Sequence, residues 1–160
     1  MRRAFVKDDY IAEAAEVSRP NGTISPHPNF VTHTGLKALE RKLQIARAAF
    51  DKAQTAEKVA DRSRRSSRAI HDIEHYSELL RTAQLVMPPA NPTKIGFGHL
   101  VSLRYDDGRE FTYRIVGEEE ADPSQGKVSF VSPVAQILME MAVGDRAIIG
   151  EYEIEILDIL

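Results

Sequence analysis

The chain has 160 residues, a formal net charge of −3 at pH 7 and 42% hydrophobic residues, which suits one ordinary domain or a small domain with an extended element. It contains no cysteine, so disulfide scaffolds and thiolate chemistry are excluded. No apolar run approaches the roughly 20 residues that cross a bilayer, and the opening MRRAFVKDDY lacks the apolar stretch of a signal peptide. We therefore expect a cytoplasmic protein without a membrane partner.

Residues 1–33 contain four basic and four acidic side chains and little periodic apolar pattern. The stretch SRPNGTISPHPN within them has three prolines and a glycine, a composition typical of extended or irregular chain. We interpret this segment as an extended N-terminal arm. Residues 10–17 favour a short helix within it.

Residues 34–87 carry two apolar seams whose members recur at alternating steps of three and four residues. Thr34 is a suitable N-cap for the first helix, and Met87-Pro88-Pro89 is expected to stop the second. The first seam consists of Leu36, Leu39, Leu43, Ala46, Phe50 and Ala53, and the second of Ala69, Ile73, Tyr76, Leu80 and Ala83. Two consecutive helices with one apolar stripe each predict an antiparallel coiled-coil hairpin.

Positive charge gathers where this hairpin must turn. Residues 34–87 hold eleven basic and seven acidic side chains, and four arginines and a lysine surround the single acid Asp61. A charge run is usually only a solvated face, but the periodicity places this one at a projecting tip independently of its charge. A basic tip is suited to enter an acidic cavity or to contact phosphates. The candidate binding residues are Asp61, Arg62, Arg64, Arg65 and Arg68, with Lys58 beside them.

Three prolines in residues 88–94 predict a linker, and residues 95–160 are rich in β-forming runs, with six basic and thirteen acidic side chains in residues 88–160. Asp107-Gly108 suits a hairpin turn, and Ser132 with Pro133 suits the start of a short helix. The expected strands are residues 99–105, 109–117, 127–131, 145–149 and 152–159. The predicted class is α+β, in which a coiled-coil hairpin precedes a twisted, mainly antiparallel sheet with one short helix.

Two short motifs point to chemistry that their surroundings do not support. His71 through His75 spell H-x-x-E-H, the inverted zinc-peptidase signature, but both histidines fall outside the apolar seam and should face solvent without a third ligand. Gly96-Phe97-Gly98 precedes a strand, whereas a dinucleotide loop opens a helix. The acids of residues 118–122 suit a solvated loop. We predict no catalytic residue, metal or cofactor, and no enzyme.

The stretch of residues 112–139 resembles the C-terminal domain of the bacterial Gre transcription factors, GreA and GreB. The similar pieces are Tyr113-Arg114-Ile115-Val116-Gly117, then Glu120-Ala121-Asp122, then Ser132-Pro133 with Ala135 and Leu138. Val31-Thr32 with Gly35-Leu36 resembles the start of the family's coiled coil, Ala83-Gln84 its end, and RAFVKDD with SPHPN the arm of a GreB-like proteobacterial branch.

The resemblance implies an N-terminal antiparallel coiled coil and a C-terminal FKBP-like domain that docks on RNA polymerase at the rim of its secondary channel. The coiled coil then enters the channel, and two acids at its tip help to hold a magnesium ion with which the polymerase cleaves backtracked RNA. Ser132 and Pro133 are implied to lie at the polymerase-docking surface.

The tip departs from the family pattern, which reads approximately G-D-x-x-E-N. Only Asp61 matches, and Arg64 stands where the glutamate belongs. Arginine does not coordinate Mg²⁺, and its charge opposes metal recruitment. The hairpin arms are also shorter than those of the family's cleavage factors, by about two helical turns or about 10 Å each. In these respects the chain is similar to shortened relatives such as Rnk, the nucleoside diphosphate kinase regulator.

The leading hypothesis is a regulator that binds bacterial RNA polymerase and inserts its coiled coil into the secondary channel without stimulating transcript cleavage. Nascent RNA or nucleotide phosphates are candidate contacts of the tip. One alternative is an active cleavage factor that combines Asp61 with Glu57, Asp72 or an acid of the polymerase. A second is direct binding of nucleic acid through the tip, although the acidic C-terminal part argues against a broad footprint.

Overall fold

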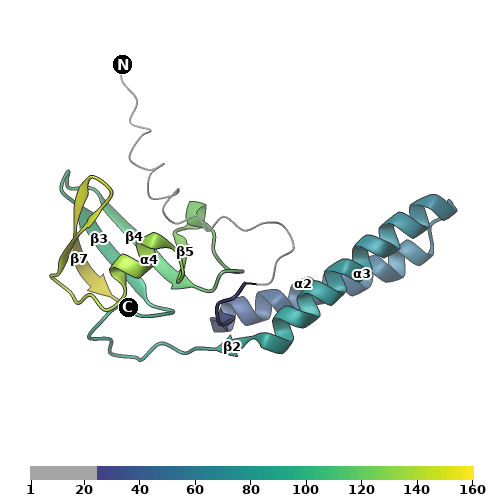
Figure 1. Cartoon of the computed structure of the whole chain (residues 1–160), viewed down its shortest axis with the longest axis horizontal. Helices are drawn as coiled ribbons and strands as arrows, with labels where there is room; N and C mark the ends of the chain where they lie inside the picture. The colour runs from purple at the N-terminus through teal and green to yellow at the C-terminus, as the bar shows by residue number, and fades with distance from the viewer. Residues whose placement is uncertain (1–24) are drawn as a thin grey trace, which may run out of the picture.

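The computed structural model describes residues 25–160, which form two connected parts. A helical hairpin, made of α2 (His33–Gln54) and α3 (Val59–Thr82), projects from a five-stranded sheet on which the short helix α4 (Pro133–Leu138) packs (Figure 1). The predicted α+β class is confirmed. Residues 1–24, with the helix predicted at residues 10–17, lie outside the described part of the chain.

The first helix begins earlier than the sequence suggested. The Thr32 hydroxyl accepts a hydrogen bond from the Gly35 backbone N–H at 3.0 Å, so Thr32 is the N-cap and His33 is the first helical residue. The prediction that Thr34 caps the helix is wrong, because Thr34 lies in the first turn with an exposed side chain. Both threonines suit the position, and a tertiary contact of Thr32, described below, decides between them.

The predicted seams do face each other. Four residues of the first seam are buried, as is Ala69 of the second, whereas the remaining members are half-buried because a lone pair of helices covers only one face. The buried members of the first seam are Leu39, Leu43, Ala46 and Ala53. Within residues 25–160, none of the helices combines the length and the apolar character that crossing a bilayer requires.

The second helix ends at Thr82, and the prediction that it continues to Met87 is wrong. Beyond Ala83 the chain is extended and forms β2 (Gln84–Leu85), which pairs in parallel with β1 (Phe30–Val31). The Asn29 side-chain amide donates to the Leu79 carbonyl at 2.8 Å and so satisfies one of the last carbonyls of the helix. Both ends of the hairpin therefore meet at one place.

The last residues of the predicted arm belong to the folded structure. The Phe30 ring lies 5.8 Å from the Phe97 ring and 5.2 Å from the Phe130 ring, measured between centroids, and so packs against the core of the sheet domain. Aromatic pairs at such separations contribute about 0.5–1.5 kcal/mol beyond the area that they bury. Phe30 therefore connects the base of the hairpin to the sheet.

The sheet is mainly antiparallel, as predicted, with strand order β5-β4-β3-β7-β6 and one parallel pair, β4 with β5. Alternate residues of its strands point into a core beneath α4, to which Val134, Ala135 and Leu138 of that helix contribute. The strands are β3 (Leu100–Tyr105), β4 (Glu110–Val116), β5 (Lys127–Ser129), β6 (Arg146–Ile149) and β7 (Tyr152–Ile159), with a 3-10 turn η1 (Pro123–Gln125) before β5.

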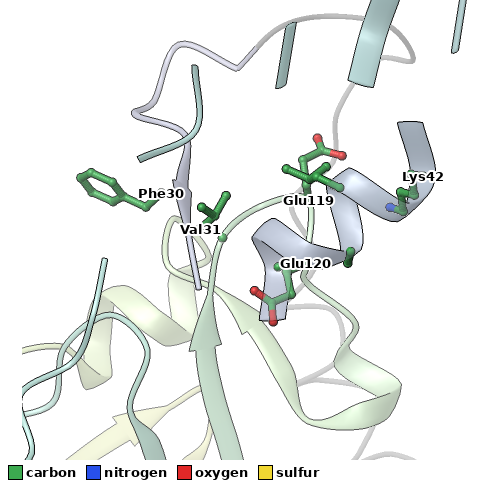
Figure 2. A pocket seen from close by; sticks show the side chains of 9 residues that line it. Phe30, Val31, Lys42, Glu119 and Glu120 are labelled. Atoms are coloured by element: carbon green, nitrogen blue, oxygen red, sulfur yellow. The ribbon is translucent and has the colours of Figure 1, made fainter. Parts of the chain in front are cut away.

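The loop after β4 contacts the start of α2 closely. The Thr32 hydroxyl donates to the Glu120 carboxylate at 2.6 Å, and Figure 2 shows Glu120 beside the first turn of α2. Gly117 lies against the Phe30 carbonyl, which a Cβ atom at Gly117 would overlap, and a Cβ atom at Gly35 would overlap the Glu120 carboxylate. The two glycines therefore allow the hairpin and the sheet domain to approach each other at this junction.

Gly117→Ala should weaken this junction, because the new methyl group meets backbone that cannot rotate away. We expect the free energy of unfolding to fall by about 2 kcal/mol, within the range for overpacking, as measured by urea denaturation. Hydrogen exchange should also accelerate at the Val86 amide, which donates to the Val31 carbonyl across β1 and β2. Gly96→Ala is the matched control, because its Cβ atom would meet His99 only at an ordinary 3.7 Å. Equal stabilities of the two variants would contradict the expectation.

His99 is buried just before β3, with 2% of its surface exposed. Its Nδ1 accepts a hydrogen bond from the Gly96 backbone N–H at 2.8 Å, which requires that nitrogen to be unprotonated. Burial lowers the pKa of His99 below its ordinary value of 6.5, and the Pro89 backbone carbonyl opposes this in part. The folded protein therefore favours the neutral imidazole.

Stability should fall on acidification because of His99. Below pH 6.5 the unfolded chain takes up the proton first, so the free energy of unfolding decreases with falling pH until the lowered folded pKa is passed. Urea denaturation between pH 8 and pH 5 should show this loss in the parent chain and a flatter profile in His99→Gln. His71→Gln, which changes an exposed histidine, should keep the parent's profile. A profile in His99→Gln as steep as the parent's would exclude His99 as the cause.

Candidate functional site

The basic cluster lies at the tip of the hairpin, at the end remote from the sheet (Figure 1). The turn between α2 and α3 is short, and hydrogen bonds to its neighbouring carbonyl groups hold it in place. The Ala56 N–H donates to the Ala53 carbonyl at 3.2 Å, and the Thr55 hydroxyl donates to the Lys52 carbonyl at 2.8 Å. The turn thus holds the first residues of α3 in a defined position.

Arg62 has a structural role within this turn. Its Nε and Nη2 atoms both donate to the Ala56 carbonyl oxygen, at 3.1 and 2.8 Å. Continuing the second seam backward from Ala69 in steps of three and four leads to Ser66 and Arg62, and Ser66 likewise faces α2 by accepting from the Gln54 amide at 3.2 Å. The seam spacing was thus the signal that separates Arg62 from the other tip arginines.

Arg64, Arg65 and Arg68 are exposed, and within residues 25–160 none of them forms an ion pair. Arg68 follows Arg64 by four residues and Arg65 by three, so the three guanidinium groups are neighbours on the helix surface. Like charges at these spacings destabilise a helix by a few tenths of a kcal/mol per pair. Within residues 25–160 no ion pair of these arginines offsets this repulsion, which favours a role in binding an anionic partner.

Asp61 is half-buried in the first turn of α3, where a negative charge stabilises the positive end of the helix dipole. Asp72 is eleven residues further along the helix, an axial rise of about 16 Å. One ion therefore cannot bind both carboxylates, and the alternative that pairs Asp61 with Asp72 is wrong. Glu57 lies in the exposed turn.

His71 and His75 are exposed on α3, as the seam predicted. With Glu74 and Glu78 of the same helix they line a groove of about 420 Å³, whose other walls include His27 and the loop of Glu118 and Glu119. Within residues 25–160, no three histidine, aspartate or glutamate side chains are placed so that they could hold a metal ion.

The predicted docking residues Ser132 and Pro133 differ in accessibility. The Ser132 side chain is fully buried, donates to the Ser129 carbonyl at 2.7 Å and accepts from the Ala135 N–H at 3.3 Å as the N-cap of α4. Pro133, the first residue of α4, is exposed. Ser132 therefore positions the helix, and Pro133 is the member of the pair that a partner can reach.

Comparison with known proteins finds relatives over most of the chain. A family described as "Transcription elongation factor, GreA/GreB, C-term" matches residues 90–160. The chain is similar to transcription elongation factor GreA of Helicobacter acinonychis, with 38% identity over 135 residues, covering 78% of this chain and 82% of the relative. A GreA from Helicobacter pylori is 37% identical over the same lengths.

Two solved structures are also similar. GreA factor homolog 1 (Gfh1) of Thermus thermophilus matches with 19% identity and a TM-score of 0.40, covering 84% of this chain and 99% of that one. A GreA/GreB elongation factor from Nitrosomonas europaea matches with 19% identity and a TM-score of 0.39, covering 83% and 98%. On the sequence identity with GreA proteins over most of both chains, this chain belongs to the GreA/GreB family of transcription elongation factors.

Proposed function

We propose that this protein binds bacterial RNA polymerase, inserts its hairpin into the secondary channel and modulates elongation without stimulating transcript cleavage. The observation that carries the proposal is the chemistry of the tip. Three exposed guanidinium groups occupy the part of the hairpin where the family pattern has a second acid, and Asp61 has no nearby acid on the same helix face.

Cleavage stimulation requires the tip to supply oxygen ligands to a magnesium ion. Asp61 offers one carboxylate, which the start of α3 already stabilises, and Arg64, three residues further along, presents a positive charge on the adjacent surface. A cation approaching this tip is repelled rather than recruited. The tip is therefore better suited to bind anions than Mg²⁺.

Guanidinium groups remain charged at every physiological pH and pair bidentately with carboxylates and phosphates. We infer that Arg64, Arg65 and Arg68 contact acidic channel walls, the end of the nascent RNA or nucleotide phosphates. The helices of 22 and 24 residues give the hairpin a length of about 33–36 Å, which sets how deeply these groups reach. The exposed Pro133 is the docking contact that we propose on the sheet domain.

Replacing Arg64, Arg65 and Arg68 together by serine should weaken the effect on elongation at low salt, with little effect on folding. Each lost charge-assisted contact costs about 1 kcal/mol, so the loss of all three should raise the half-maximal concentration about a hundredfold. The measurement is RNA extension by purified polymerase at several ionic strengths. Arg62 is kept, because its removal would disturb the turn.

The matched control replaces Lys37, Arg41 and Arg47 by serine. This variant loses the same charge, but from exposed positions on α2 away from the tip. The control should retain the parent's effect. If the tip variant acts like the parent at every salt concentration, the arginines are only a solvated face. Failure of the parent to bind core polymerase at modest salt would overturn the whole proposal.

On stalled, backtracked complexes the parent protein should not shorten the RNA 3′ end above the intrinsic rate, and Asp61→Ala should change nothing. The variant Arg64→Glu tests the cause, because it places a second carboxylate three residues from Asp61. If this variant stimulates cleavage, the chemistry of the tip is what limits cleavage in the parent. If it does not, the length of the hairpin limits cleavage as well. Cleavage by the parent that is abolished by Asp61→Ala would establish the active-factor alternative instead.

A further inference from the structure

A second groove lies at the junction of the hairpin and the sheet domain, far from the tip. It has a volume of about 330 Å³ and opens between the first turn of α2, the segment that follows β2, and the outer face of β4 and β5. Its walls include His33, Thr34, Val86, Met87, Arg114 and Lys127. The volume falls at the lower end of the range for small-molecule sites.

Two cations meet on the floor of this groove. Arg114 of β4 and Lys127 of β5 are directly opposite each other in the parallel register, so their side chains lie on the same face of the sheet. Like charges placed opposite each other on neighbouring strands destabilise a sheet. The Arg114 Nη1 atom donates to the Gly98 carbonyl at 3.2 Å, which orients the guanidinium and leaves its other N–H groups for a ligand.

The other four basic residues of residues 88–160 all form ion pairs, whereas these two form none with the described residues. Lys94 pairs with Glu140, Arg104 with Glu155, Arg109 with Asp107, and Arg146 with Glu153 and Glu155. Arg114 and Lys127 form no ion pair within residues 25–160, although residues 88–160 have thirteen acids and only six bases. Among the described residues the groove is lined by one acid, Glu120, which accepts the hydrogen bond of the Thr32 hydroxyl.

We propose that this groove binds a small phosphate-bearing anion between Arg114 and Lys127. A phosphate group accepts from a guanidinium and an ammonium together, and the Thr34 hydroxyl and the His33 ring on the opposite wall offer further donors. Val86 and Met87 form an apolar wall that suits the organic part of a phosphate ester. The bound anion contacts the hairpin base and the sheet together.

The test is a titration of the full-length protein with inorganic phosphate, pyrophosphate and adenosine 5′-monophosphate at constant ionic strength, followed by amide NMR shifts. At least one phosphate compound should shift the Thr34, Arg114 and Lys127 resonances saturably, whereas adenosine without phosphate should not. A pentaribonucleotide forms a further arm. If only the oligonucleotide binds, the small-molecule assignment is overturned, and if no probe binds, the site is overturned.

Arg114→Gln combined with Lys127→Gln should weaken binding at least tenfold. Arg104→Gln is the matched control, because it removes one exposed arginine that is already ion-paired on the same sheet and should bind like the parent. Lys127→Gln alone covers the case in which the double variant is unstable. The Lys127 side chain forms no hydrogen bond within residues 25–160, so this variant should fold like the parent and weaken binding severalfold. Parent-like affinity in both the single and the double variant would refute the proposal.

Discussion

The arrangement of the hairpin against the sheet domain depends on the two hydrogen bonds of the Thr32 hydroxyl. As an acceptor it caps α2, and as a donor it bonds to Glu120 in the loop after β4. One side chain thus sets where the hairpin begins and which part of the sheet domain it contacts. The Phe30 ring and the close approach of Gly117 surround this contact and restrict movement about it. The direction in which the basic tip points follows from these few residues.

Local patterns were sufficient to predict most elements of the fold. The seams are long enough for their spacing to establish two facing helices, and alternation in residues 95–160 indicates strands with one buried face. The caps were less predictable. Thr32 and Thr34 have equal intrinsic preference, and only Glu120, 88 residues distant in sequence, distinguishes them. The pairing of β1 with β2 was missed because two-residue strands are too short to show a period.

The basic residues do lie at the tip of the hairpin, as the seams indicated, but the sequence analysis treated them as equivalent. Extending the seam by two steps would have placed Arg62 on the side of α3 that faces the turn, where its exposed side chain donates to the Ala56 carbonyl, so that signal was present in the sequence. Ser132 is a typical N-cap residue at the start of the predicted short helix. That structural role conflicts with exposure at a docking surface, and the sequence alone contained this conflict. By contrast, Arg114 and Lys127 could not be paired from sequence, because nothing local specifies that β5 runs parallel to β4.

Because β1 pairs with β2, the hairpin is a modular insertion between these two strands. Phe30 and Gln84 are register partners, so the chain enters and leaves the hairpin at neighbouring points. Seven residues added to each helix, or removed from each, would keep the apolar seam in phase and change the length by about 10 Å without altering the base. Evolution can therefore vary the reach of such a hairpin independently of the domain that carries it.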